Sequence, residues 1–272
     1  MKKASIRLSL SGFLFEDNSR KQSLTFKNFA ILAREAGYTG VELRKTQISL
    51  DTPADTIAQY RTILDDNDLS VTCMTPRGLP TPTEERNEYF KRYLELAGKM
   101  RCPLLKISGG AVKDIDWLSR AVETAASYEI DLAINTHVNS PTETVSGALE
   151  LANSINSSHF GLLYDCMHLC IANEDYLNAI ETLYPHICGL LVQCLRPSAN
   201  GEKPVIQHAG KDYSKTCIDQ TPIQDWSAVI SKFKSLGYNG WITVIENSWP
   251  VDQQKDIAIR TAKQLQKLWQ EE

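Results

Sequence analysis

Acid and imidazole side chains close two short apolar runs of the sequence. The run at 159–165 ends on Asp165, and His168 follows three residues later. A second run, at 240–246, ends on Glu246. Carboxylates and imidazoles transfer protons and bind divalent metals, so two strand ends that carry them predict one shared chemical site.

The elements that must position these groups follow from the hydrophobic pattern. Apolar runs of strand length alternate with longer segments of helical period, eight of each, which predicts repeated βα units and a parallel sheet. The predicted strands are 5–10, 39–44, 70–74, 103–108, 130–136, 159–165, 187–194 and 240–246. The long stretch 195–221 contains Gly201, Pro204 and Gly210, and it is predicted to be an irregular loop of functional importance.

One turn sequence occurs twice. The tetrads 37–40 (GYTG) and 237–240 (GYNG) both lie between a helical pattern and a strand, about 200 residues apart. Repetition of such a unit favours a cyclic βα architecture. The predicted fold class is therefore α/β, a (β/α)8 TIM barrel that forms a single domain over residues 1–272.

Composition narrows the class of partner. The chain has 272 residues, 42% hydrophobic residues and a net charge of -4, so it lacks the basic surface expected of a protein that binds nucleic acid or an anionic membrane. No segment reaches the roughly 18 apolar residues of a membrane span. Seven cysteines without a CxxC pair are typical of a reducing compartment. We expect a cytoplasmic protein with a small-molecule partner.

In a TIM barrel the active site lies at the carboxyl ends of the strands. Polar residues near these ends are too numerous for a packing layer alone. The candidates on or just after the strands are Glu42, Arg44, Lys106, Asn135, His137, Asp165, Gln193 and Glu246. His208 and Lys211, on the stretch after the seventh strand, are candidates for contacts with substrate oxygens, although a solvated loop is an equal explanation.

The sequence resembles the xylose isomerase-like TIM barrels, which include sugar isomerases and epimerases. The resemblance is carried by GYTGVEL at 37–43, by the DxxH motif of Asp165 and His168, and by GYNGWITVIE at 237–246. It implies a divalent metal held by four strand-end side chains. Asp165 and Glu246 stand at two of these positions, whereas Asn135 and Gln193 replace the usual Glu and His.

Amides are weaker ligands than the groups they replace. A carboxamide brings no negative charge and lacks the imidazole nitrogen, so the affinity of the site for Mn²⁺ or Mg²⁺ is expected to fall. The candidate metal ligands are Asp165, Glu246, Gln193 and Asn135. An arrangement without a metal is the alternative. In it, Lys106 and Arg44 neutralise Asp165 and Glu246.

The candidate catalytic residues are Glu246, His168 and His137. The first would transfer a proton beside a carbonyl, and a histidine would act as the acid. Three of the site residues also have simpler structural explanations. Asp165 could be the N-cap of the next helix, Glu246 an exposed strand end, and His137 a surface residue. Glu42, Arg44, Lys106, Asn135 and Gln193 are expected to contact substrate. Phe13 and Trp249, which follow the first and last strands, are candidates for an apolar wall.

The resemblance implies a sugar or polyol isomerase or epimerase with an altered metal site. With Asn135 in place of an acid, a one-base isomerisation or a β-elimination fits better than a symmetric two-acid epimerisation. The alternative is a barrel that has lost the usual metal ligands, acting as a metal-independent lyase or as a binding or partner subunit. Phosphodiester cleavage is disfavoured, because five histidines cannot supply a histidine-rich zinc cluster. A homo-oligomer remains possible.

Overall fold

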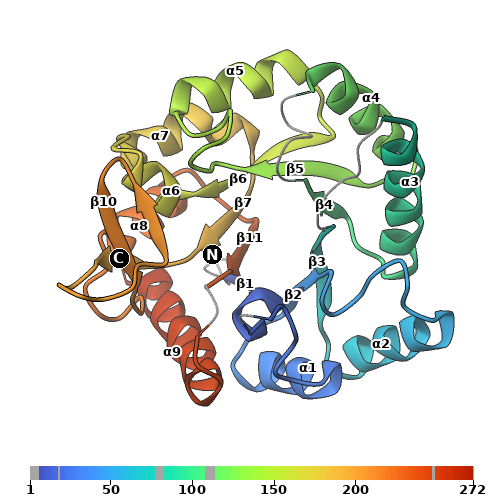
Figure 1. Cartoon of the computed structure of the whole chain (residues 1–272), viewed down its shortest axis with the longest axis horizontal. Helices are drawn as coiled ribbons and strands as arrows, with labels where there is room; N and C mark the ends of the chain where they lie inside the picture. The colour runs from blue at the N-terminus through green and yellow to red at the C-terminus, as the bar shows by residue number, and fades with distance from the viewer. Residues whose placement is uncertain (1–5, 18, 77–82, 108–113, 247–248, 272) are drawn as a thin grey trace.

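The computed structural model describes residues 6–17, 19–76, 83–107, 114–246 and 249–271. Eight parallel strands close into a barrel in the order β1-β11-β7-β6-β5-β4-β3-β2, which confirms the predicted (β/α)8 fold class (Figure 1). The strands are β1 (Arg7–Ser11), β2 (Gly40–Arg44), β3 (Ser70–Thr75), β4 (Leu104–Lys106), β5 (Asp131–Asn135), β6 (Phe160–Asp165), β7 (Ile187–Val192) and β11 (Trp241–Val244). All eight strands overlap the predicted ranges. Position 5, which begins the range 5–10, and position 108, which ends the range 103–108, lie outside the described residues.

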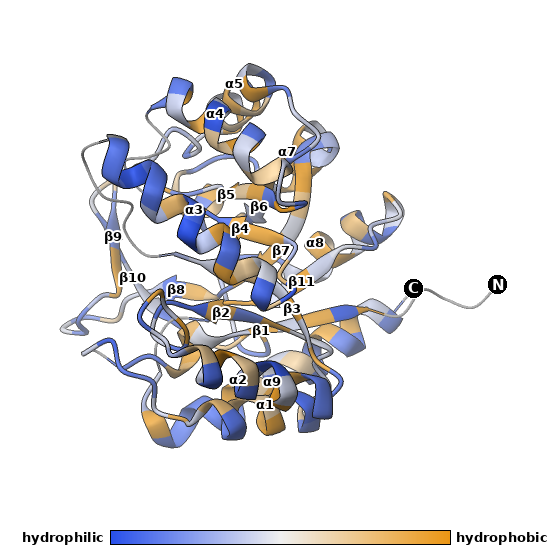
Figure 2. Cartoon of the chain, turned by 90° about the vertical axis from the view of Figure 1, so that its right-hand side faces the viewer, coloured by the Kyte–Doolittle hydropathy of each residue, from blue (hydrophilic) through white to orange (hydrophobic). Residues whose placement is uncertain are grey.

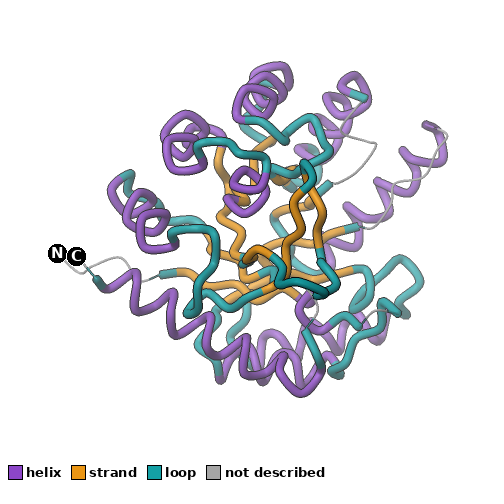
Figure 3. Tube along the Cα trace, turned by 60° about the vertical axis from the view of Figure 1, so that its left-hand side comes forward, coloured by secondary structure: helices purple, strands orange, loops and turns teal. Residues whose placement is uncertain are grey.

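Helices surround the strands, as Figure 3 shows. They are α1 (Phe26–Glu35), α2 (Ala54–Asp66), α3 (Thr83–Lys99), α4 (Ile115–Ala126), α5 (Val145–Ile155), α6 (Cys166–Ile171), α7 (Tyr176–Leu183), α8 (Trp226–Ser235) and α9 (Val251–Gln270). The 3-10 helix η1 (Gly12–Phe15) follows β1, and η3 (Tyr184–His186) precedes β7. Among the described residues, no helix combines the length and apolar character needed to cross a membrane.

Both GYxG tetrads form the predicted helix-to-strand turn. Gly37 and Gly237 have φ of +89° and +72°, which a residue with a Cβ adopts only with strain. The following tyrosines anchor each turn: Tyr38 donates its hydroxyl hydrogen to Ala258 O at 2.8 Å, and Tyr238 donates to Trp241 O at 2.9 Å. The two turns therefore end α1 and α8 in the same way and lead into β2 and β11.

Strand side chains alternate between the barrel interior and the surrounding helices. The outward residues join the main core with the helices, and the barrel strands are mostly orange, or hydrophobic, in Figure 2. The inward residues form a separate small cluster of Ala133, Leu163, Leu191 and Ile245, with Phe13 and Leu104 packed against it. Asn135, Asp165 and Gln193 lie two residues beyond members of this cluster, so they extend the inward rows toward the mouth of the barrel.

The stretch 195–221 is not the irregular loop that its composition predicted. It contains a three-stranded antiparallel sheet of β8 (Leu195–Pro197), β9 (Ile206–His208) and β10 (Lys211–Lys215), in the order β8-β10-β9 (Figure 2). Ala209 and Gly210, at φ of +47° and +75°, form the tight turn between β9 and β10. The strands are short and partly exposed, so they show little of the apolar alternation that would have revealed them.

Candidate functional site

A cavity of about 220 Å³ opens where the barrel strands end. Strands β2, β3, β4, β5 and β6 each contribute their last residue, and the segments that follow the strands supply most of the rest. The lining residues are Phe13, Arg44, Thr75, Lys106, Asn135, His137, Asp165, His168, Gln193, Ile206 and Ile245. The small volume suits a compact ligand, since pockets for drug-sized molecules begin at about 300 Å³.

Most of the predicted site residues meet in this cavity. Seven of them are among its lining residues: Arg44, Lys106, Asn135, His137, Asp165, His168 and Gln193. Glu42 lies behind the lining and reaches it through ion pairs with Lys106 and Arg44. Glu246, His208 and Lys211 are not among the residues that line the cavity.

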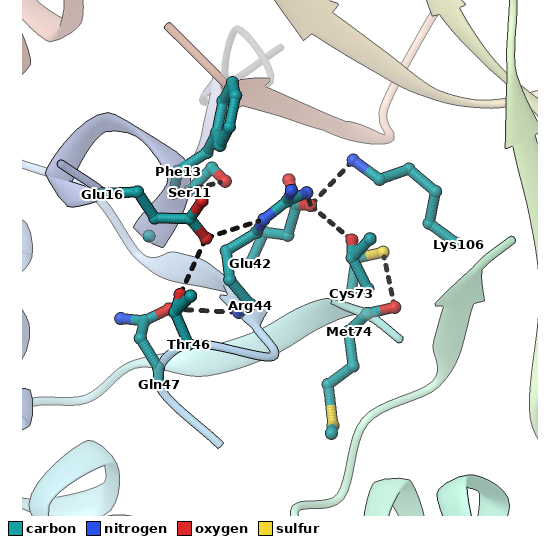
Figure 4. A network of polar contacts seen from close by, with 12 residues as sticks. Ser11, Phe13, Glu16, Glu42, Arg44, Thr46, Gln47, Cys73, Met74 and Lys106 are labelled. Atoms are coloured by element: carbon teal, nitrogen blue, oxygen red, sulfur yellow. Dashed lines mark hydrogen bonds and ion pairs between the residues drawn. The ribbon is translucent and has the colours of Figure 1, made fainter. Parts of the chain in front are cut away.

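Glu42 is the centre of a buried polar network (Figure 4). Its Oε1 lies 2.7 Å from Lys106 Nζ and 3.4 Å from Arg44 Nη1, and it accepts a 2.7 Å hydrogen bond from the Thr75 hydroxyl. Burial raises the pKa of Glu42, but the charges of Lys106 and Arg44 and the hydrogen bonds outweigh it and bring the pKa to about 2. Glu42 is therefore an anion that fixes two cations at the cavity wall.

This network corrects the predicted partners of the two cations. Lys106 and Arg44 were expected to neutralise Asp165 and Glu246, but both make their ion pairs with Glu42, and Arg44 also contacts Glu16 Oε1 at 3.5 Å. Lys106 still acts on Asp165 through its charge, which lowers the pKa of that carboxyl. The direct pairing follows from the barrel order, since β2 and β4 both flank β3.

Asp165 combines a structural role with a place in the cavity. Its Oδ1 accepts a hydrogen bond from Met167 N at 3.2 Å and caps α6, and its Oδ2 accepts one from Gln193 Nε2 at 2.5 Å. Complete burial raises the pKa of Asp165 to about 7, against the opposing effects of Gln193 and Lys106. A carboxyl with this pKa exchanges a proton readily near neutral pH.

The rings of two histidines lie against one another at an interplanar angle of 35°. The ring centroids of His137 and His168 are 3.7 Å apart. Burial, with His137 and His208 nearby, holds the pKa of His168 well below its usual range, so this ring is neutral. His137 Nδ1 lies 2.6 Å from Val138 O, and because a carbonyl only accepts, Nδ1 carries the hydrogen. In neutral His137 the unprotonated nitrogen is therefore Nε2, which can accept a proton.

Glu246 is placed differently from the prediction. It is completely buried, but the residue of this segment that lines the cavity is its neighbour Ile245. Glu246 Oε2 accepts a long hydrogen bond of 3.4 Å from Cys194 N, and Oε1 has no hydrogen-bond partner in the described part of the chain. Burial raises the pKa of Glu246 to about 8. It is neither the exposed strand end of the simpler explanation nor a direct part of the cavity wall.

The β8–β10 sheet forms one wall of the cavity through Ile206. His208 lies near a different partner, with Nε2 3.5 Å from Glu143 Oε1, and Lys211 is exposed.

Of the two aromatic candidates, Phe13 lines the cavity and Trp249 does not. The sequence prediction missed Glu16 and Thr75. Thr75 directly follows the predicted strand 70–74 and ends β3, at a position equivalent to that of the chosen residues.

The donor set does not fit a regular divalent-metal centre. Within the described ranges, no three His, Cys, Asp or Glu side chains are grouped so that they could hold a metal ion. Gln193 presents an N–H group to Asp165 rather than a ligand to a cation, and Glu246 is not in the cavity wall. The retained carboxylate of Asp165 alone is a poor site for Mn²⁺ or Mg²⁺, which need several oxygen ligands.

The comparisons with known proteins agree with the fold. The family model for the xylose isomerase-like TIM barrel matches residues 31–268. Among curated proteins, none matches the chain. Three similar solved structures differ in what they are said to bind or do.

One is a probable 3-DHS dehydratase, AsbF, from Bacillus anthracis, with 18% identity, a TM-score of 0.78, and coverage of 96% of this chain and 98% of that one. A second is the D-psicose 3-epimerase of Clostridium cellulolyticum H10 with D-tagatose, with 13% identity, a TM-score of 0.69, and coverage of 97% and 96%. A third, from Mycobacterium smegmatis, is a xylose isomerase-like barrel in complex with magnesium, with 12% identity, a TM-score of 0.70, and coverage of 98% and 96%. At these identities the structures show a shared fold. With the family match over most of its length, the chain belongs to the xylose isomerase-like TIM barrel family.

Proposed function

We propose that this protein catalyses proton transfer at a carbon next to a carbonyl in a small sugar or polyol derivative. The observation that carries the proposal is the presence of Lys106, a cation, and of the His137–His168 pair in one cavity of about 220 Å³. A cation stabilises the negative charge that develops on the carbonyl oxygen, and a neutral imidazole accepts the proton. Similar structures named as a dehydratase and an epimerase support this class of chemistry.

His137 is the proposed base. Its Nδ1–H is held by Val138 O, which leaves Nε2 to accept the proton from carbon. His168 packs against the ring and keeps it in place at 3.7 Å. Asp165, with a pKa of about 7, returns a proton to oxygen or to the leaving hydroxyl. In elimination of water, His137 takes the proton from carbon and Asp165 gives one to the leaving hydroxyl. In isomerisation, the enediol formed by the first two transfers returns a hydroxyl proton to Asp165, and His137 gives its proton to the neighbouring carbon.

Lys106 is the proposed electrophilic group. Glu42 holds Nζ at 2.7 Å, and the ammonium has two further N–H bonds with which to meet a carbonyl oxygen. Fixing the cation in advance means that no reorganisation is needed when charge develops on the substrate. Asn135, in contrast, cannot accept a proton, so the site favours a one-base isomerisation or a β-elimination over a symmetric two-acid epimerisation.

The proposal is tested by incubating the protein in D₂O with a panel of ketoses, aldoses and keto-polyols and following deuterium incorporation by NMR. His137→Asn keeps a polar side chain but removes the base, so incorporation is expected to fall by about 100-fold or more. His159→Asn is the matched control, because His159 pairs with Asp131 away from the cavity and is half exposed. Equal incorporation by both variants would contradict the role of His137.

The alternative is a binding or partner subunit without catalysis. It is favoured by the way the polar groups satisfy one another, since Glu42 already pairs with Lys106 and Arg44. A barrel of this kind would bind a polyol with a thermal shift but incorporate no deuterium into any member of the panel. That pair of results would replace the catalytic proposal.

A further inference from the structure

We propose that this barrel works without a resident divalent cation, because hydrogen bonds between its own side chains take the place of the metal and Lys106 supplies the positive charge. The second half of this inference rests on the proposed function, whereas the first half concerns binding alone. The geometry around Asp165 supports the first half, because Asp165 is the retained member of the metal set implied by the family resemblance.

Both oxygens of Asp165 already accept hydrogen bonds from the protein. Gln193 Nε2 donates to Oδ2 at 2.5 Å, and Met167 N donates to Oδ1 at 3.2 Å. Asp165 is completely buried, and Gln193 is 6% exposed. A cation that bound Oδ2 would have to displace this hydrogen bond from a buried donor, which disfavours binding before any ligand is gained.

The other positions cannot compensate. Asn135 directs Nδ2 toward Thr136 O at 3.4 Å, so this amide offers at most one neutral oxygen. Glu246 lies behind Ile245, and its Oε2 accepts from Cys194 N. A divalent ion at Asp165 would therefore gain one carboxylate, at most two amide oxygens and the imidazole of His168, whose Nε2 lies 3.8 Å from Asp165 Oδ2, so it would meet a single anionic ligand where such ions select several.

The positive charge that a metal would bring is present in another form. Lys106 Nζ lines the same cavity as Asp165, and its charge acts on the Asp165 carboxyl. The Lys106 side chain is 5% exposed and is held by Glu42, so the cation is fixed in a largely dry site. A fixed ammonium next to a cavity that also holds two adjacent imidazoles gives the electrostatic stabilisation of an enolate without a metal.

The direct test is a titration of the wild-type protein with Mn²⁺, with free Mn²⁺ measured by electron paramagnetic resonance. We expect a dissociation constant weaker than about 100 µM at pH 7.5, as for a site with few anionic ligands. One Mn²⁺ per chain bound more tightly than this overturns the inference. The measurement needs no variant, so it does not depend on the folding of an altered chain.

A gain-of-binding variant tests the cause. The double substitution Asn135→Glu and Gln193→His removes the donor to Asp165 and restores a carboxylate and an imidazole, so Mn²⁺ should bind at least about 10-fold more tightly than to wild type. Adding Asp165→Asn to this variant should abolish the gain and place the ion at this site. A folded double variant, with a melting temperature near that of wild type, that shows no gain would refute the account of Gln193.

The measurements distinguish failure of the proposed catalysis from failure of the inference that no divalent cation is bound. A wild-type protein that binds no Mn²⁺ and incorporates no deuterium supports the absence of a cation and removes the proposed catalysis. One that incorporates deuterium only after Mn²⁺ is added supports the catalysis and overturns the inference about the metal.

Discussion

The pair formed by Glu42 and Lys106 determines the charge of the cavity wall. Because both side chains are buried and 2.7 Å apart, removing Lys106 takes away the shortest ion pair of Glu42 in a dry site and leaves it only the 3.4 Å contact with Arg44 and the hydrogen bond from Thr75. Lys106→Met is expected to lower the free energy of unfolding by about 3 kcal/mol, measured by urea denaturation. The double variant Lys106→Met with Glu42→Gln removes both charges and should recover most of this loss. If the single and double variants are equally stable, Glu42 does not depend on Lys106.

Glu246 should make the stability of the protein depend on pH. Burial raises its pKa from about 4.5 to about 8, so the folded chain holds this proton over a range in which the unfolded chain releases it. Stability from this group therefore falls as pH rises between these values, by at most about 1.4 kcal/mol per pH unit.

Glu246→Gln removes this dependence. The variant should match wild type near pH 4.5 and exceed it by about 4 kcal/mol at pH 8 to 9, measured by denaturation at each pH. A difference between variant and wild type that stays constant across this range would show that Glu246 is ionised in the folded protein.

At the scale of elements, the β8–β10 sheet provides a wall of the cavity through Ile206. Ile206→Ala should raise KM by about 3- to 10-fold with little change in kcat, because an apolar wall contacts substrate and transition state alike. Val205→Ala is the control, since Val205 is 42% exposed and does not line the cavity. An unchanged KM in the Ile206 variant, or an equal rise in both, would separate the sheet from substrate binding.

The helix-to-strand turns make a second prediction at this scale. Gly237→Ala places a Cβ on a residue with φ of +72°, and although there is open space around it, the backbone conformation costs about 1 kcal/mol. Gly98→Ala is the matched comparison, because Gly98 is exposed within α3 and a Cβ there also meets open space. It should stabilise the protein by about 0.5–1 kcal/mol. Thermal denaturation that shows the same sign for both would contradict the role of the positive φ.

At the scale of the whole molecule, the barrel was predictable because its signals are local and repeated. Eight apolar runs gave eight strands, and the two GYxG tetrads gave turns with positive φ at Gly37 and Gly237. The β8–β10 sheet was not predictable, because its short strands pack on the main barrel mostly through Leu195, Ile206 and Tyr213. Strands this short owe their pairing to tertiary contacts rather than to their own pattern.

The sequence predicted which residues lie at the site better than it predicted which of them form ion pairs with one another. Strand ends identify which residues approach the cavity, but β11 is largely buried on both faces, so alternation alone did not tell whether Ile245 or Glu246 faces inward. The pairing of Lys106 with Glu42 joins residues more than 60 positions apart, and only the closed barrel brings them together.

The central claim is that this cavity transfers a proton from carbon with its own side chains and without a divalent cation. The measurement that tests it most directly is deuterium incorporation from D₂O into the sugar and polyol panel by protein treated with EDTA. We predict incorporation that EDTA leaves unchanged and that His137→Asn reduces by about 100-fold or more. Incorporation that disappears with EDTA and returns with Mn²⁺, or no incorporation into any compound of the panel, would contradict the account.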